Sequence, residues 1–136
     1  MLTTAIVSAS GSLAAAASRT IHLYDLAGHD SVKPRTFVMS ERHGLSGLRW
    51  SHWGERTATG KGTMEINTCE PNCAEGRMRT LPGAQLQLSG VRVDQGHRYY
   101  RQYRIIDQSF THAERNLFSR WTNAYVPSDF SVPAPG

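Results

Sequence analysis

The feature that most constrains the fold is a run of alternating residues in the middle of the chain. Every second residue between positions 57 and 66 is apolar or a glycine, and the residues between them carry hydroxyl or charged groups. Because successive side chains of a strand point to opposite faces of a sheet, this period of two predicts a strand with one buried face. The buried face would consist of Ala58, Gly60, Gly62, Met64 and Ile66.

Two glycines lie on the apolar face of this predicted strand. Glycine weakens a strand interior, and it often marks a place where another group approaches the backbone closely. A large ring on a neighbouring strand would cover such a position. Trp50 and Trp53 precede the run by a short turn, so we expect one of them to lie over Gly60 and Gly62.

Alternating or β-branched and aromatic segments recur along the rest of the chain, and Asp94-Gln95-Gly96 is typical of a hairpin turn. A chain of 136 residues has room for one core. The sequence therefore predicts an all-β fold, a small barrel or sandwich of about six antiparallel strands. The predicted strands cover residues 20–26, 35–40, 48–51, 57–66, 84–93 and 98–106.

One short C-terminal helix is predicted after the last strand. Thr111 followed three residues later by Glu114 matches a capping box, and Leu117, Phe118 and Trp121 recur at helical spacing. Residues 127–136 are rich in Pro and Ser and are expected to be an extended tail. The single β domain would then span residues 18–126.

The N-terminal segment, residues 1–17, resembles a secretory signal peptide. Residues 5–17 are apolar and small and end in an Ala-x-Ala pattern, although no charged side chain precedes them. The segment is too short to span a bilayer. We expect the protein to be secreted and extracellular, with no membrane span.

Cys69 and Cys73 are the only cysteines. A C-x3-C pair supplies two of the four ligands of a structural zinc site, and the six histidines show no paired spacing to complete it. In an exported protein an even cysteine count favours a disulfide, with free thiols and a metal site as the alternatives. Pro71 and Asn72 already favour a turn between the two cysteines.

The same region resembles a group of small exported actinobacterial proteins. Its motif is W-x-x-W-G, then A-x-G-x-G, then N-x-C-x-P-x-C-A-x-G, and the resemblance covers roughly residues 35–105. It implies export and a compact β domain, and it implies no activity. The matching residues are Trp50, Trp53, Gly54, Ala58, Gly60, Gly62, Asn67, Cys69, Pro71, Cys73, Ala74 and Gly76.

Charge and aromatic residues indicate where a ligand would bind. Fifteen Lys+Arg against 11 Asp+Glu give a net charge of +4, which favours anionic partners. On a strand over 98–106, arginines would stand beside tyrosine rings, an arrangement that stacks on sugars or bases and binds phosphates. An exposed tryptophan would mark a contact with a glycan or protein. The candidate ligand-binding residues are Trp50, Trp53, Arg98, Tyr100, Arg101 and Arg104.

No complete catalytic, cofactor or metal-binding motif is present, and so the sequence assigns no catalytic residue, cofactor or metal ligand. The first hypothesis is a non-enzymatic binding domain for an anionic cell-envelope polymer or a secreted protein, with nucleic acid disfavoured by export. A second hypothesis is a secreted inhibitor of a protease or other hydrolase that presents the Cys69–Cys73 loop. A third is a small hydrolase that uses His43 or His52. The oligomeric state is left open.

Overall fold

The computed structural model describes residues 20–67, 72 and 74–131. The signal-like segment 1–17 and both cysteines, Cys69 and Cys73, lie outside the described residues. Within them the chain forms β1 (Ile21–Tyr24), β2 (Asp30–Ser31), β3 (Phe37–Val38), β4 (His43–Ser51), β5 (Thr57–Asn67), β6 (Met78–Asp94), β7 (His97–Ile106), α2 (His112–Phe118), β8 (Thr122–Asn123) and the 3-10 helix η1 (Pro127–Phe130).

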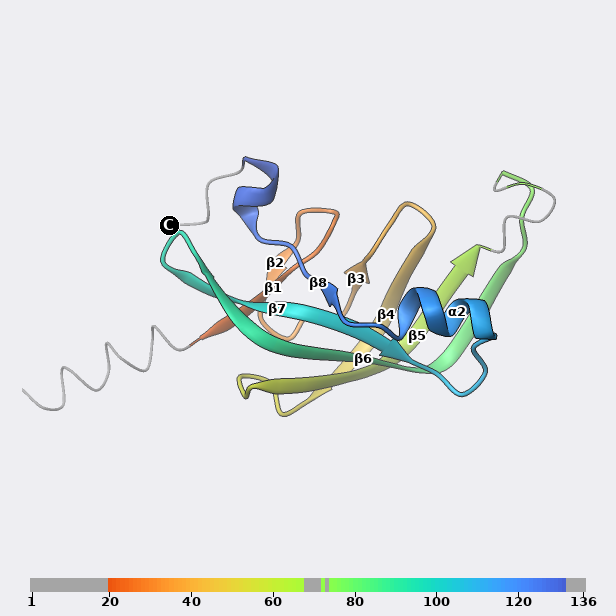
Figure 1. Cartoon of the computed structure of the whole chain (residues 1–136), viewed down its shortest axis with the longest axis horizontal. Coiled ribbons are helices and arrows are strands. Elements are labelled where there is room, and N and C mark those ends of the chain that lie inside the picture. The colour runs from red at the N-terminus through yellow and green to blue at the C-terminus, as the bar shows by residue number, and fades with distance from the viewer. Residues whose placement is uncertain (1–19, 68–71, 73, 132–136) are drawn as a thin grey trace, which may run out of the picture.

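The strands form one curled sheet with the order β2-β1-β7-β6-β5-β4-β3, and β8 adds to β7 (Figure 1). The sheet closes about half a barrel, so the prediction of an all-β fold with one short C-terminal helix is confirmed. One detail differs from the prediction. β1 pairs with β7 in a parallel arrangement, because the chain returns to its first strand only after the β3–β7 meander. The other strand pairs are antiparallel.

The core lies on the concave side of the sheet, and the central strands supply it by alternation, which is interrupted in β6 between Leu81 and Ala84, where the β5–β6 register shifts. Ala58, Met64 and Ile66 of β5 are buried, as the period of two predicted. They pack with the alternating apolar residues of β6 and with β4 and β7 in one cluster. Burial of these side chains is the main favourable contribution to folding.

The two glycines of β5 are explained by two different neighbours. Gly60 pairs directly with Trp50 across β4 and β5, and the indole ring lies 2.9 Å from where a Cβ would stand. The predicted covering of Gly60 by a tryptophan is thus confirmed. Gly62 lies instead against the backbone of an irregularity in β4, where the register shifts between Ser46 and Arg49. A Cβ on Gly62 would stand 2.5 Å from the carbonyl oxygen of Ser46.

The carboxylate of Asp25 ties the loop after β1 to the edge strand β3. Asp25 is 2% exposed. It accepts hydrogen bonds from the backbone N–H groups of Ala27 (3.0 Å), His29 (2.9 Å) and Val38 (3.0 Å). The N–H of Leu26 also donates to the carbonyl of Val38 at 3.1 Å. These bonds join the two ends of the curled sheet and fix its curvature.

The predicted capping box at the start of α2 is present. Thr111 Oγ1 accepts from the N–H of Glu114 at 3.1 Å, and the Glu114 carboxylate accepts from the N–H of Thr111 at 2.9 Å. Arg79 of β6 pairs with the same carboxylate, which anchors the helix to the sheet. The helix ends at Phe118, so Trp121 lies beyond it rather than on its face.

The expectation of an extended tail from residue 127 is wrong for residues 127–130. Pro127 stands at the first turn of η1, where its fixed φ angle favours a helical turn, and both Pro127 and Val126 are buried. This segment packs near Tyr24 and Tyr125, with the ring of Phe130 5.9 Å and 5.4 Å from theirs. Among the described residues, no helix is long and apolar enough to cross a membrane.

Candidate functional site

Both tryptophans singled out as ligand candidates are packing residues that are only partly accessible. The rings of Trp50 and Trp53 meet edge to face at 4.8 Å. Their indole N–H groups donate to the carbonyls of Pro34 (2.6 Å) and Ile21 (3.1 Å). Neither is the exposed tryptophan that would mark a contact with a glycan or protein, because both are half-buried. Trp53 lies in the turn after β4, so the alternation of a strand does not set its direction.

Tyr100 is not a surface residue, which corrects its assignment as a ligand candidate. It is fully buried. Its hydroxyl donates to the carbonyl of Glu55 at 2.7 Å and accepts from the N–H of Gly54 at 2.8 Å. Burial raises the pKa of Tyr100, and the hydrogen bond from Gly54 partly opposes this rise. Tyr100 therefore holds the turn between β4 and β5, which places Arg56.

The three arginines of β7 have different surroundings and do not form one continuous binding surface. Arg98 borders one groove, and Arg101 borders another. Arg104 donates to the side-chain oxygen of Gln87 at 2.7 Å and stands 4.5 Å from the centre of the Trp121 ring. Arg104 is thus already engaged within the protein, whereas Arg98 and Arg101 remain available to a ligand.

The groove beside Arg98 contains a second arginine, Arg56, that sequence reasoning missed. Its volume is about 460 Å³, and Glu55, Gly54, Ser89 and the residues around Gly90 complete its lining. Within the described part of the chain, neither guanidinium has a hydrogen-bond or ion-pair partner. The carboxylate of Glu55 pairs instead with His52 at 2.9 Å. We call this the Arg56–Arg98 groove.

Local backbone geometry brings these two arginines together. The N–H of Gly90 donates to the carbonyl of Arg56 at 3.2 Å, which holds the start of β5 beside the C-terminal part of β6. Arg98 pairs with Val93 in the β6–β7 hairpin. The pairing of Arg98 with Val93 could have been predicted from the hairpin turn at Asp94-Gln95-Gly96. The position of Arg56 could not, because it depends on the turn that the Tyr100 hydroxyl holds.

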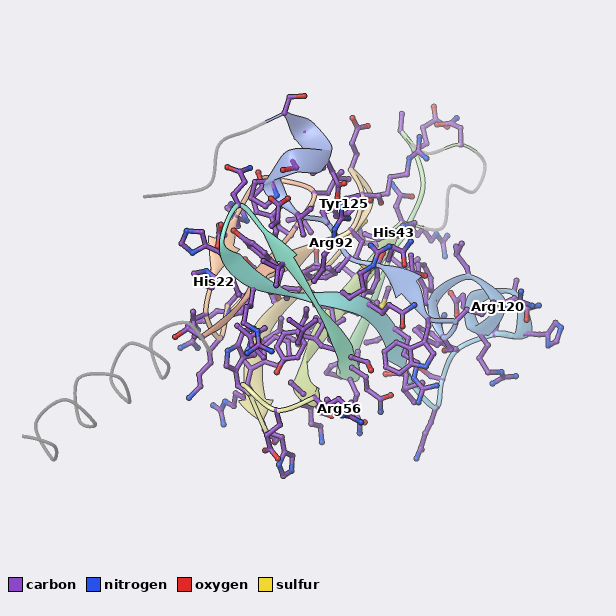
Figure 2. The ribbon with its side chains drawn as sticks, turned by 60° about the vertical axis from the view of Figure 1, so that its left-hand side comes forward. His22, His43, Arg56, Arg92, Arg120 and Tyr125 are labelled. Carbon is purple, nitrogen blue, oxygen red and sulfur yellow. The ribbon has the colours of Figure 1, made fainter. Side chains whose placement is uncertain are left out.

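The second arginine groove is partly neutralised. Arg92 and Arg101 border it together with Tyr125 and Phe130, and Figure 2 shows Arg92 close to Tyr125. The carboxylate of Asp129 lies 3.7 Å from the Arg92 guanidinium. Asp129 pairs with an arginine of this groove, whereas Glu55 of the Arg56–Arg98 groove pairs with His52, so this groove is less suited to an anion.

A cluster of polar side chains joins β1, β2 and β7 through hydrogen bonds. The Asp30 carboxylate contacts His22 Nδ1 at 2.8 Å and accepts from the Tyr99 hydroxyl at 2.7 Å. The ring of His97 lies 5.7 Å from that of His22. Burial and the hydrogen bond to Asp30 raise the pKa of Tyr99. In the described ranges no group of three His, Cys, Asp or Glu residues could hold a metal ion.

The two histidines considered for hydrolysis have different surroundings. His43 Nδ1 lies 3.1 Å from Ser40 Oγ, and that oxygen also accepts from the N–H groups of Arg42 and His43. This is the geometry of a turn, and no described carboxylate orients His43 as a catalytic pair requires. His52 pairs with Glu55 in the open solvent. Hydrolase activity thus stays a prediction without a geometric argument behind it.

His43 supports a prediction about pH. Burial lowers the pKa of His43 below its usual 6.5, and the positive charge of Arg42 lowers it further. The unfolded chain therefore binds this proton more readily than the folded one. The contribution of His43 to stability is full above about pH 6.5 and decreases as the pH falls toward the folded pKa.

We expect His43→Gln to remove this part of the pH dependence. Urea unfolding of both proteins, measured from about pH 7.5 to about pH 5, would give a stability difference that shrinks below about pH 6.5. A stability difference that stays constant across this range would show that His43 does not titrate differently in the two states.

We compared the chain with protein-family models, with curated proteins and with solved structures, and none of the three comparisons found a match. The resemblance to small exported actinobacterial proteins therefore stays a prediction, as do export and the disulfide.

Proposed function

We propose that this protein is a non-enzymatic extracellular binding domain that engages an anionic polymer of the cell envelope through the Arg56–Arg98 groove. The observation that carries the proposal is that two arginines line one groove and that, among the described residues, neither forms an ion pair with Glu55, the acidic residue that also lines it. Arginine presents a planar set of donors that matches carboxylate and phosphate groups, and such charge-assisted hydrogen bonds are the strong ones.

The groove is built on rigid elements. Arg98 is at the start of β7, between β1 and β6, and the turn that leads to Arg56 is fixed by the buried hydroxyl of Tyr100. A preorganised site loses little conformational freedom on binding, which favours affinity. The open groove would accept one charged unit of a repeating polymer, and several protein molecules would then bind along one chain.

A protein partner is the second candidate, and one observation favours it. The start of β6 extends beyond β7, because β6 pairs with β5 from Met78 onward but with β7 only from Gln85, whereas β4 accompanies β5 as far as Ile66 (Figure 1). The sequence between β5 and β6 contains Cys69 and Cys73, and this function would use it to contact the other protein. An inhibitor of a secreted hydrolase is the case that this shape would serve.

The test is co-sedimentation of the full chain with insoluble cell walls that carry a phosphodiester polymer, at low and at high salt. We expect salt-sensitive retention, and we expect Arg56→Gln/Arg98→Gln to weaken it about tenfold, since two exposed charge contacts are lost. The matched control is Arg49→Gln/Arg120→Gln, which removes the same charge at two exposed positions outside the groove. Arg56 and Arg120 are well separated in Figure 2.

Equal retention of the two double variants would show that net charge alone binds the wall, and the groove would be discarded. Absence of retention at both salt concentrations would exclude the polymer. Inhibition of a secreted hydrolase that is lost after reduction and alkylation of the cysteines would then identify the protein-partner function.

A further inference from the structure

A separate apolar pocket lies between α2 and the edge of the sheet that carries β3 and β4. Its volume is about 390 Å³, within the range of small-molecule sites. His43 borders it from the sheet (Figure 2), and the His43 ring meets that of Phe118 at 5.2 Å. The lining residues are Met39, Ser40, Arg42, His43, Tyr103, Leu117, Phe118 and Thr122. We call this the α2 pocket; it shares no lining residue with the Arg56–Arg98 groove.

The walls of the α2 pocket are apolar and include one side chain that the fold leaves uncovered. Met39 and Phe118 are buried and belong to the core, so they form a fixed floor. Leu117 is 63% exposed, and it follows the capped first turn of a short helix whose position the sheet fixes through Arg79. An apolar ligand in the pocket would remove part of Leu117 from water, which is favourable in proportion to the area covered.

The polar groups of the α2 pocket are donors or cations. Ser40 Oγ already accepts two backbone N–H groups, so its own hydrogen goes to His43 Nδ1, which leaves the opposite ring nitrogen of a neutral His43 as a donor. The hydroxyl of Tyr103 and the guanidinium of Arg42 have no hydrogen-bond partner among the described residues. No aspartate or glutamate lines the pocket.

A neighbouring groove limits the direction in which a ligand would extend. It shares Ser40, Arg42 and His43 with the α2 pocket, and it is also lined by Glu41 and Glu65, which do not line the α2 pocket. Neither glutamate forms an ion pair with Arg42 in the described part of the chain. An anionic group would therefore stay on the α2 side of Arg42, away from the two carboxylates.

We propose that the α2 pocket binds a small amphipathic carboxylate. The apolar body of this ligand packs on Met39, Leu117 and Phe118. Its carboxylate accepts from Arg42, with the His43 ring as a further donor. The apolar walls favour ligands with an apolar body, and the excess of hydrogen-bond donors over acceptors favours ligands with a negative charge. This inference does not depend on the Arg56–Arg98 groove.

The test compares phenylbutyrate with phenylbutanol, which share the ring and differ in the charged group. Binding to the full chain is measured by calorimetry and by amide chemical-shift changes. We expect shifts centred on Met39, His43 and Phe118 and tighter binding of the carboxylate. We expect Arg42→Gln to weaken the binding of phenylbutyrate about fivefold, which is the size of effect that the loss of an exposed ion pair produces. The same variant should bind phenylbutanol as tightly as the wild type.

Two further variants separate the apolar contact from the charge. Leu117→Ser should weaken the binding of both compounds. Val93→Ser should weaken the binding of neither, because Val93 is also mostly exposed but lies outside the pocket. Arg120→Gln is the matched charge control, and Arg56→Gln/Arg98→Gln should bind phenylbutyrate normally. Equal effects of Arg42→Gln and Arg120→Gln would overturn the proposal, and so would shifts that map outside the pocket. The substituted side chains are exposed, apart from that of Arg98, which is half-buried and has no hydrogen-bond or ion-pair partner among the described residues. The variants therefore fold, and a thermal melt checks this.

Discussion

Replacing Asp25 with alanine is expected to lower the free energy of unfolding by about 3 kcal/mol. The variant leaves the N–H groups of Ala27, His29 and Val38 without the carboxylate that accepts them. An orphaned buried donor costs about 1–3 kcal/mol, and part of this cost is relieved where water reaches the loop. The loss is large because the same carboxylate joins β3 to the loop after β1.

Urea unfolding of Asp25→Ala and wild type measures this loss, with the denaturant slope as a check that the unfolded state is unchanged. Asp25→Asn keeps one acceptor oxygen and should lose about half as much. Glu41→Ala is the control, because it removes an exposed carboxylate that has no hydrogen bond or ion pair within the described residues, and it should stay within about 0.5 kcal/mol of wild type. A loss below about 1 kcal/mol for Asp25→Ala would show that the sheet holds its curl without this carboxylate.

Replacing Gly62 with alanine is expected to destabilise the protein by about 3 kcal/mol, the upper end for an overpacked core position. The new Cβ would stand 2.5 Å from the carbonyl oxygen of Ser46 and 3.3 Å from the Cα of Leu48. Both atoms belong to the backbone, so the clash is relieved only if β4 and β5 separate. The melting temperature should fall by about 10 °C.

Two other glycines of the same sheet give a graded control. Gly83 has no atom within 4 Å of an added Cβ and no positive φ angle, so Gly83→Ala should stay within about 0.5 kcal/mol of wild type. Gly60→Ala meets the ring of Trp50 at 2.9 Å, and its cost should fall between the other two because a side chain moves more easily than a backbone. If all three substitutions had the same effect, strand propensity rather than close approach would explain them.

The alternation of β5 and β6, the hairpin turn and the capping box of α2 could all be predicted from the sequence. Each depends on interactions within a few residues or between neighbouring strands. Gln95 and Gly96 both have positive φ angles, as a two-residue hairpin turn requires. For the same reason Trp50 and Gly60 could be matched, since they are partners in adjacent strands joined by a short turn.

The candidate site was predicted less well because it depends on distant segments. Alternation along β7 places Tyr99 and Tyr100 on opposite faces, and the sequence predicted that Tyr100 is accessible. Both are fully buried: Tyr100 belongs to the main core, and the segment around Val126 returns over the face that Tyr99 occupies. The arginines of β7 are separated for a related reason: Arg104 is engaged by Trp121, and Arg101 lies beside the returning chain.

By itself the sequence determined that this chain forms a β-sheet with one buried face, because a helix cannot bury one face of a segment with a period of two. Only the tertiary structure decided which arginines share a groove and that Asp25 closes the sheet. Asp25 accepts a hydrogen bond from Val38, 13 residues further along the chain. Arg56 lines the same groove as Arg98, which is 42 residues away (98 − 56 = 42). Such pairs follow from the curvature of the whole sheet, which no local pattern encodes.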